Sequence, residues 1–313
     1  MSRQTCSAES SIRRCGRRRF ISAALAGAGA LFTGAQAALS AGGPAPGSTA
    51  ASDLVTLGNT GIRTSRLAQG TGWNGGARSS AHTRLGEKAF DELIRHGLDS
   101  GIRLMDLADL YGSHPYARHA LAGISRDRYE ILTKIWPRTE FWNSASGGAK
   151  AEVDRFRKEL KSDVLDICLI HCMTNADWPN ECARIRDELS ELKQQGAVRA
   201  VGVSCHDFGA LKVASEHPWV DVLLARINNV GKSAAMDASV EEVAAVLGRA
   251  KANGKTIIGM KIFGAGKLTA PEQKNASLKF VFENRLVDAI TIGMMRPEEV
   301  DDTVRRMSEP LGG

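Results

Sequence analysis

From residue 54 onward, short apolar runs alternate with amphipathic runs, and the alternation repeats eight times. The apolar runs have the length of β-strands, and several are apolar throughout, as strands buried on both faces are. The runs between them carry apolar residues at the spacing of one helix face, beginning with Phe90, Leu93, Ile94 and Leu98. Eight consecutive strand–helix units predict an α/β fold, the (β/α)8 TIM barrel, which needs roughly 250 residues.

The boundaries between these runs favour the same fold. Strands are expected at residues 64–71, 102–107, 129–133, 164–170, 197–203, 220–227, 256–262 and 289–292. Helices are expected around residues 90–98, 116–121, 152–160, 185–192, 208–215, 240–252, 271–282 and 297–307. Gly101, Gly196 and Gly254 precede strands, where a left-handed helix C-cap favours glycine. A doubly wound sheet, the alternative, should carry a glycine-rich turn after its first strand.

Residues 55–62 precede the first barrel strand and contain the turn Gly58-Asn59-Thr60-Gly61. Asn and Gly between two short β-type runs predict a β-hairpin. We expect this N-terminal hairpin to plug the floor of the barrel.

The first 37 residues differ from the rest in charge. They hold six arginines and one acidic residue, Glu9, so their net charge is +5. The net charge of the whole chain is +6, which leaves +1 for the remaining residues. So small a charge gives no electrostatic footprint for nucleic acid. Gly16-Arg17-Arg18-Arg19-Phe20-Ile21, an uncharged Ala/Gly-rich stretch and Ala35-Gln36-Ala37 follow one another in the order of an export signal.

This segment resembles the bacterial twin-arginine (Tat) signal; a disordered basic tail is the alternative. We expect residues 1–37 to be a Tat-type signal peptide, residues 38–52 a flexible linker rich in Gly, Pro, Ala and Ser, and residues 53–313 the barrel. The resemblance implies that the Tat translocase is a partner during export. It also implies that the protein is periplasmic or otherwise exported; without use of the signal, the protein would be cytoplasmic. No stable membrane span is expected, because glycines interrupt the stretch.

Four cysteines follow the signal: Cys168, Cys172, Cys182 and Cys205. Their low density argues against a disulfide scaffold. Cys168 and Cys172 are too far apart to pair, at about 13 Å for a strand that rises ~3.3 Å per residue. A metal site that combines cysteines with His171 and His206 is conceivable, but strand alternation points Cys172 away from the face of His171. We expect no metal.

Four polar residues each stand where an apolar strand ends: Asp106, Tyr111, Lys134 and His171. In a (β/α)8 barrel the strand ends converge on one pocket, so residues far apart in sequence can meet there. A carboxylate, a phenol, an amine and an imidazole together suit proton transfer to a carbonyl. Each residue alone also has a structural interpretation, such as an ion pair for Asp106 and Lys134.

The segments around these residues carry a resemblance to a known family. Asp106-Leu107-Ala108-Asp109-Leu110-Tyr111-Gly112, Leu132-Thr133-Lys134 and Leu169-Ile170-His171, with the hairpin Leu57-Gly58-Asn59-Thr60-Gly61, resemble the aldo/keto reductases, which are NAD(P)H-dependent enzymes on a (β/α)8 barrel. The resemblance covers residues 54–311. It implies that Tyr111 donates the proton, that Lys134 and Asp106 tune the acidity of Tyr111, and that His171 orients the substrate carbonyl. Asp109 and His114, near the same turn, are expected to be solvated loop residues.

Elementary chemistry also supports a tyrosine acid. Hydride addition to a carbonyl develops an alkoxide that must receive a proton. A nearby ammonium favours phenolate, so Lys134 is expected to lower the pKa of Tyr111 by roughly two or three units, at ~3–4 kcal/mol of differential interaction. Asp106 would keep the amine charged, and a neutral His171 would donate a hydrogen bond to the carbonyl oxygen.

Cofactor binding is expected at the later strand ends. No G-x-G-x-x-G stands between a strand and a helix, and Gly264-Ala265-Gly266-Lys267 is not a Walker loop. The resemblance implies that this loop cradles the pyrophosphate, while the helix start after Gly293 favours an anion. Arg296 is the candidate for an adenosine 2′-phosphate, so NADP(H) is expected rather than NAD(H). The expected cofactor contacts are Gly70, Thr71, Ser204, Cys205, Asn228, Lys261, Gly264, Gly266, Lys267, Leu268, Gly293 and Arg296.

The sequence departs from the family pattern in three places. Ser204-Cys205 stands where many members have Ser-Asn to hold the nicotinamide carboxamide. The glutamine of the sixth strand is missing around Leu224, where Arg226 or Asn228 could substitute. Glu299 stands near the adenine side, where its charge would oppose a 2′-phosphate.

Four tryptophans lie in loops after strand ends: Trp73, Trp136, Trp142 and Trp178. They indicate a pocket for an apolar carbonyl substrate, with packing inside the loops as the alternative. The sequence predicts an NAD(P)H-dependent oxidoreductase that reduces an aldehyde or ketone to an alcohol, or runs the reverse reaction. The alternatives are a nucleotide-binding sensor or binding subunit without turnover, and a lyase with Lys134 as its Schiff-base amine, which the neighbouring Asp106 disfavours.

Overall fold

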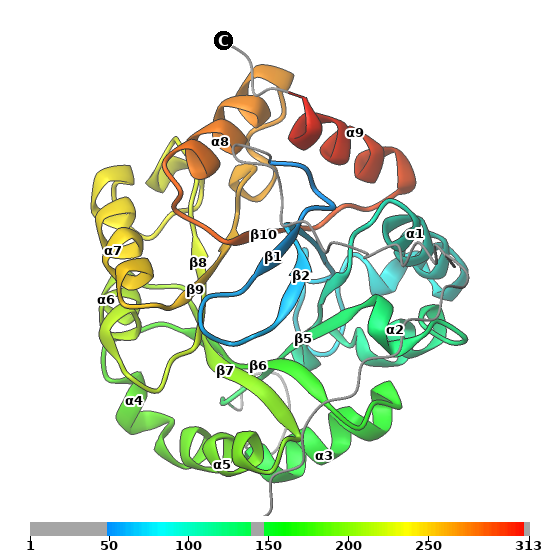
Figure 1. The fold of residues 1–313 in the computed structure, drawn as a ribbon, viewed down its shortest axis with the longest axis vertical. Helices are drawn as coiled ribbons and strands as arrows, with labels where there is room; N and C mark the ends of the chain where they lie inside the picture. The colour runs from blue at the N-terminus through cyan, green and yellow to red at the C-terminus, as the bar shows by residue number, and fades with distance from the viewer. Residues whose placement is uncertain (1–48, 139–146, 310–313) are drawn as a thin grey trace, which may run out of the picture. The chain divides into compact units, whose positions relative to one another are not determined.

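The structure is a computed structural model that describes residues 49–138 and 147–309. Eight parallel strands close into a barrel in the order β10-β3-β4-β5-β6-β7-β8-β9, and helices surround it (Figure 1). The barrel strands are β3 (Leu67–Gly70), β4 (Leu104–Asp106), β5 (Glu130–Ile135), β6 (Leu165–Met173), β7 (Val198–Cys205), β8 (Val222–Arg226), β9 (Thr256–Met260) and β10 (Ala289–Ile292). The predicted (β/α)8 fold is confirmed.

The helices pack their apolar faces on the outside of the barrel. They are α1 (Glu87–Asp99), α2 (His114–Ala120), α3 (Ala149–Leu160), α4 (Trp178–Glu181), α5 (Ala183–Gln194), α6 (Phe208–Glu216), α7 (Val240–Ala252), α8 (Pro271–Glu283) and α9 (Pro297–Ser308). Two short 3₁₀ turns, η2 (Asp109–Tyr111) and η5 (Gly264–Gly266), follow β4 and β9. Among the described residues, no helix combines the length and apolarity needed to cross a membrane.

The strands bury side chains on both faces, which produces two apolar layers. Ile167 and Leu169 of β6 belong to the cluster inside the barrel, whereas Cys168 and Ile170 belong to the cluster between barrel and helices. Side chains alternate across a strand, so His171 is the next inward position after Leu169. The alternation therefore carries His171 to the mouth of the barrel.

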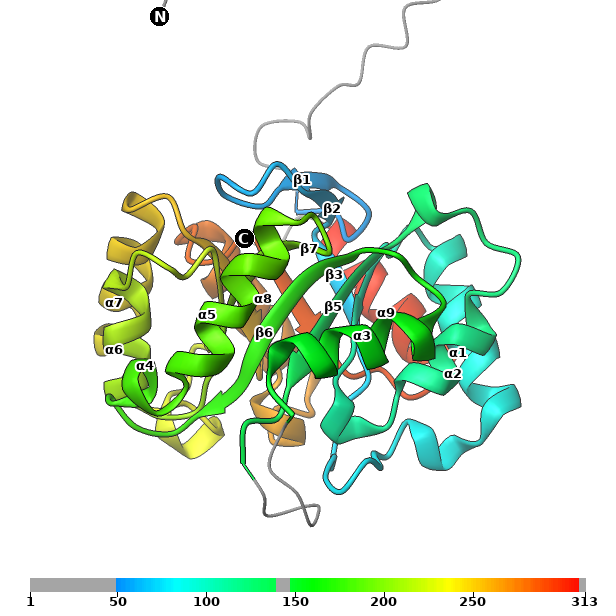
Figure 2. The ribbon, with the colours of Figure 1, turned by 90° about the horizontal axis from the view of Figure 1, so that it is seen from below.

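The predicted hairpin is present and covers one end of the barrel. Strands β1 (Leu54–Thr56) and β2 (Arg63–Ser65) pair antiparallel, and Figure 2 shows them above the barrel. Leu57 and Ile62 of the turn are fully buried in the inner cluster of the barrel. At Gly58, with φ +47°, a Cβ would lie 2.9 Å from a backbone oxygen, so only glycine fits there.

Two boundaries differ from the expected ones. The first barrel strand begins at Leu67 instead of residue 64, because Arg63–Ser65 pairs within the hairpin. Residues 49–52, expected in the flexible linker, contact the barrel: Thr49 Oγ1 donates to Met307 O at 2.8 Å, and Ala51 is fully buried. The predicted signal peptide and residues 38–48 lie outside the described residues.

Candidate active site

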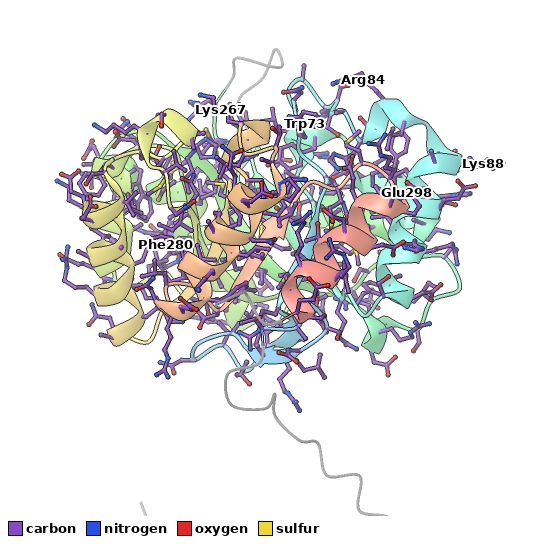
Figure 3. The ribbon with its side chains drawn as sticks, turned by 90° about the horizontal axis from the view of Figure 1, so that it is seen from above. Trp73, Arg84, Lys88, Lys267, Phe280 and Glu298 are labelled. Carbon is purple, nitrogen blue, oxygen red and sulfur yellow. The ribbon has the colours of Figure 1, made fainter. Side chains whose placement is uncertain are left out.

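The strand ends opposite the hairpin enclose a cleft of about 400 Å³. Its wall contains Asp106, Tyr111 and Thr291 together with the loops that follow β3, β9 and β10. Figure 3 shows Trp73 and Lys267 at this end of the barrel. A larger open groove of about 1310 Å³ lies outside the barrel beside α2 and α3, and none of the four predicted catalytic residues lines it.

Lys134 is fully buried and is paired with Asp106. Its Nζ donates to Asp106 Oδ1 and to Leu107 O at 2.8 Å. The second carboxylate oxygen, Oδ2, accepts from Thr291 Oγ1 at 2.8 Å. Burial lowers the pKa of Lys134 and the Asp106 carboxylate raises it. Three strands therefore contribute to one buried ion pair whose polar atoms are satisfied, which a low-dielectric site requires.

Tyr111 stands directly against this pair. Its Oη lies 3.3 Å from His171 Nε2, and the two rings meet edge to face at 5.3 Å between centres. The Nζ of Lys134 lies 4.9 Å from the centre of the Tyr111 ring. The structure thus brings Asp106, Tyr111, Lys134 and His171 together, as the strand-end positions predict.

The pKa of Tyr111 differs from the expectation. Burial raises it well above its usual value of 10.0, and the Asp106 carboxylate and Cys172 raise it further. The expected lowering by Lys134 is wrong for this state of the protein, because the amine is already paired with Asp106. Burial lowers the pKa of His171 well below 6.5, as do Lys134, His206 and Arg138. Near neutral pH, the phenol therefore keeps its proton and the imidazole is neutral.

The loop after β3 packs on the Tyr111 ring. A Cβ at Gly72 would lie 2.2 Å from Tyr111 Cζ, and one at Gly75 would lie 2.7 Å from Tyr111 Cδ1. Both distances are shorter than any real carbon contact. Two glycines are thus needed for this close approach.

The turn that carries Tyr111 is also anchored from its other side. Asp109 and His114, expected to be solvated, are 4% and 1% exposed. Asp109 Oδ1 accepts from Arg155 Nη1 at 2.9 Å. The ring of His114 bridges Thr133 Oγ1, at 2.7 Å, and Glu159 Oε2, at 2.8 Å. Because Arg155 and Glu159 are on α3, local sequence around Tyr111 gave no sign of these partners.

Part of the predicted cofactor set lines the cleft. These residues are Gly70, Lys261, Gly266, Leu268 and Gly293. The cleft wall also contains Leu224 and Glu299, noted as departures from the family, and Phe263 and Lys274, which the sequence analysis missed. The only signal for Lys274 was its place in the first turns of the helix after the seventh barrel strand.

The backbone amides of the expected pyrophosphate cradle, in the loop after β9, make hydrogen bonds within the loop. The amide of Gly264 donates to Lys261 O at 2.8 Å, and the amides of Gly266 and Leu268 donate to Phe263 O at 3.1 and 3.2 Å. The loop closes on itself through these bonds. Gly264 is buried and does not line the cleft, whereas Gly266 and Leu268 do; a role for these amides at a pyrophosphate stays a prediction.

Two predicted phosphate ligands point elsewhere. Lys267 Nζ donates to Ser233 O at 2.9 Å. Arg296 is exposed and lies 3.3 Å from Glu299, whose other carboxylate oxygen accepts from Met295 N at 2.9 Å. Glu299 therefore occupies the anion position at the start of α9, and neither Lys267 nor Arg296 lines the cleft.

Three further residues predicted to contact the cofactor, Thr71, Ser204 and Cys205, have other surroundings in the structure. Thr71 Oγ1 donates to Asp106 O at 2.8 Å, and Ser204 Oγ accepts from Cys172 N at 2.8 Å. Cys205 is fully buried in the outer apolar layer. None of the three lines the cleft, so their assignment to the cofactor is not supported.

Asn228 is likewise a support for the backbone. Its amide nitrogen donates to Ala234 O at 2.8 Å and to Lys261 O at 3.2 Å. Its amide oxygen accepts from the backbone nitrogens of Val230 and Gly231 at 2.9 and 3.0 Å. The side chain is fully buried and has no capacity left for a nicotinamide carboxamide.

An irregularity in β6 changes the direction of Cys172. The pairing with β7 shifts between Ile170 and Met173, and Cys172 has φ +66°. Strict alternation therefore ends at His171, and Cys172 lies close enough to Tyr111 to affect the pKa of the phenol. Among the described residues, Cys168, Cys172, Cys182 and Cys205 are free.

The four tryptophans of the predicted substrate pocket have different surroundings. Trp73 is 43% exposed and lines the cleft. Trp136 packs edge to face on His171, with ring centres 5.4 Å apart. Trp178 is 1% exposed and packs on Trp219, so it belongs to the core and its assignment to the pocket is wrong. Trp142 lies outside the described residues.

Comparisons with known proteins agree with this fold. The family model described as the aldo/keto reductase family matches residues 67–309. The chain belongs to the aldo/keto reductase family. A curated relative, aldo-keto reductase YhdN of Bacillus subtilis, is 30% identical over 163 residues, which are 49% of this chain and 46% of the relative. This chain thus spans about half the length of the curated relatives it matches.

Two solved structures show the same fold at low sequence identity. An aldo-keto reductase from Bacillus halodurans in its holo form has a TM-score of 0.66 and 18% identity, over 82% of this chain and 90% of that one. An aldo-keto reductase from Klebsiella pneumoniae in complex with NADPH has a TM-score of 0.60 and 17% identity, over 83% of this chain and 91% of that one.

Proposed function

We propose that the protein is an NADP(H)-dependent oxidoreductase that reduces an aldehyde or ketone to an alcohol, or catalyses the reverse oxidation. The observation that carries this proposal is the 3.3 Å contact between His171 Nε2 and the Oη of Tyr111, a residue that lines the cleft. A phenol and a neutral imidazole side by side can both reach one carbonyl oxygen. Family membership supports the same chemistry.

Several residues on the cleft wall support binding of a nicotinamide dinucleotide there. Small residues on its wall, such as Gly70 and Gly293, leave room for a ligand near the backbone. Lys261 and Lys274 offer positive charge to phosphates, and Phe263 offers a flat apolar surface. The bound nucleotide would supply the hydride. These residues would hold it in place of the loop amides that the sequence analysis favoured.

The proton comes from Tyr111 in this proposal. As hydride adds to the carbonyl carbon, the C=O double bond opens and its electron pair moves to oxygen, which takes the phenolic proton. Since the pKa of Tyr111 is raised, the proton is present throughout the neutral range. A neutral His171 can donate a hydrogen bond to the same oxygen, and Lys134 offsets the charge of Asp106 beneath the ring.

Turnover is the test of this function. We would mix the protein with one equivalent of NADPH and follow nucleotide fluorescence after adding a panel of aldehydes and ketones. Oxidation of the bound nucleotide within one turnover supports the reductase. Tight nucleotide binding without oxidation by any carbonyl compound would instead support the second candidate, a nucleotide-binding sensor or subunit. Leu224 on the cleft wall, in place of a polar side chain, is the observation that favours this second candidate.

We also propose that residues 1–37 direct Tat-dependent export, which supports a periplasmic location. The proposal rests on the order of Arg17-Arg18, Phe20 and the Ala/Gly-rich stretch. Tat transport of a folded protein would let the nucleotide bind before export. Changing Arg17 and Arg18 to lysine should retain the uncleaved chain in the cytoplasm, as cell fractionation would show. Unchanged export of that double variant would contradict the proposal.

A further inference from the structure

The hydroxyl of Thr291 reaches Asp106 across a neighbouring strand of the barrel. Thr291 is at an inward position of β10, because Ala289 belongs to the cluster inside the barrel and Ile290 to the cluster between barrel and helices. Its Oγ1 donates to Asp106 Oδ2 at 2.8 Å. Asp106 is on β4, and β3 lies between β4 and β10. The bond therefore links two strands that do not pair with each other.

Gly70 of β3 leaves the space that this bond needs. Gly70 pairs in register with Asp106. A Cβ at Gly70 would lie 3.0 Å from Thr291 Oγ1 and 3.1 Å from Gly293 N. Both distances are tighter than ordinary van der Waals contact. A side chain at position 70 would therefore press on the hydroxyl, whereas glycine lets it reach the carboxylate.

The backbone of Asp106 is held independently of Thr291. Thr71 donates to Asp106 O twice, from its backbone nitrogen at 3.1 Å and from Oγ1 at 2.8 Å. Of the carboxylate oxygens, Oδ1 accepts from Lys134 Nζ, and Oδ2 accepts from Thr291 alone within residues 49–138 and 147–309. The last torsion of an aspartate is soft. Loss of the Thr291 hydroxyl would thus free the carboxylate to turn and leave the backbone in place.

We propose that Thr291 is a positioning residue for the reaction: through Asp106 it fixes the ammonium of Lys134 opposite the Tyr111 ring. The inference rests on the proposed reductase function and adds a residue to its site. The Nζ of Lys134 lies 4.9 Å from the centre of that ring, and charges stabilise a transition state best when they are held in place beforehand. Thr291 also lines the cleft, so direct contact with a ligand is the alternative that the test must separate.

The variants are Thr291→Val, which removes the hydroxyl and keeps the branched shape, and Thr291→Ser, which keeps the hydroxyl. Thr64→Val is the matched control. Thr64 is fully buried on β2 of the hairpin, at the other end of the barrel, and its Oγ1 donates to Glu130 Oε2 at 2.6 Å. The Glu130 carboxylate is in turn paired with Arg103 at 2.8 Å. The control therefore loses the same kind of bond, to a paired carboxylate, far from the cleft.

The first measurement is oxidation of bound NADPH in a single turnover, with a carbonyl compound that the wild type reduces. Thr291→Val should lower its rate by about tenfold to hundredfold, as small misplacements of reacting groups do. The Kd for NADPH and the KM for the carbonyl compound should stay within about twofold. Thr291→Ser should stay within about threefold of the wild-type rate. Thr64→Val should match the wild-type rate, although both valine variants should unfold at lower urea concentration.

The second measurement needs no turnover. Nitrogen NMR on lysine-labelled protein records the Nζ resonance of Lys134, which is assigned by its absence in Lys134→Met. This resonance should move in Thr291→Val and keep its position in Thr291→Ser and Thr64→Val.

Three results would overturn the inference. One is an Nζ resonance of Lys134 that is the same in Thr291→Val and in the wild type. Another is a single-turnover rate that Thr291→Val and Thr64→Val change equally. The third is a rise in Kd or KM at an unchanged rate, which would assign Thr291 to direct ligand contact. A wild type that reduces no carbonyl compound would refute the reductase proposal, and the Nζ resonance would still decide whether Thr291 positions Lys134.

Discussion

The amine of Lys134 lies 4.9 Å from the centre of the Tyr111 ring and is bonded to Asp106, on the strand beside its own. The cation therefore faces the ring, while its charge is shared with a carboxylate. Burial raises the pKa of the phenol, and the Asp106 carboxylate raises it further although an ammonium is close. In the reaction that we propose, Tyr111 would keep its proton until a stronger base, the developing alkoxide, forms.

Tyr111→Phe tests the proton donor directly. The variant keeps the ring between Gly72 and His171 and loses the hydroxyl. We expect carbonyl reduction to fall by roughly 10²-fold to 10⁴-fold, the usual contribution of a general acid, with the Kd for NADPH within about twofold of wild type. Tyr116→Phe on α2 is the matched control, since Tyr116 packs on Phe90 outside the cleft. Reduction at the wild-type rate by Tyr111→Phe would remove Tyr111 from the mechanism.

The buried pair of Lys134 and Asp106 predicts a large and non-additive effect on stability. Lys134→Met leaves the Asp106 carboxylate without its cation in a dry site, so unfolding free energy should fall by about 3–5 kcal/mol. The double variant Lys134→Met with Asp106→Asn removes both charges and should recover much of that loss. Urea unfolding of the wild type, of the single variants Lys134→Met and Asp106→Asn, and of the double variant measures the effect. If the losses of the two single variants simply added, the pair would not be coupled.

The pH dependence of the reaction follows from two shifted pKa values, the raised pKa of Tyr111 and the lowered pKa of His171. Reduction needs a protonated Tyr111, whose pKa is raised, and a neutral His171, whose pKa is lowered. The rate of reduction should therefore stay level from slightly acid to moderately alkaline pH. Oxidation needs the phenolate, so its rate should climb with pH. Profiles of kcat in both directions measure this. A reduction rate that declines through a pKa near neutrality would instead mean that Lys134 acidifies the phenol.

Arg155 is predicted to position the turn that carries Tyr111. Its guanidinium binds Asp109 and Glu159, so Arg155→Met leaves the buried Asp109 without this partner and loosens the turn. We expect kcat to fall by roughly tenfold while NADPH affinity changes little. Arg157→Met, on the same helix and paired with Asp154 at 3.6 Å, is the matched control. A general loss of folding would show in the thermal unfolding curve, and equal kcat values for the two variants would contradict the prediction.

Local patterns in the sequence were sufficient for the barrel, the hairpin plug and the four strand-end residues. Hydrophobic spacing records which face of each strand or helix is buried, and the closed parallel fold then requires Asp106, Lys134 and His171 to meet at one end. Tyr111 follows because its turn directly succeeds β4.

Tertiary structure decided what those positions do. Only the folded chain shows that Asp109 meets Arg155, that Trp178 packs on Trp219 in the core, and that the loop after β9 uses its amides for its own turn. It also places Lys261 and Asp106 on the wall of one cleft. Burial, partners and pKa depend on neighbours from distant segments, and the order of residues along one segment does not contain them.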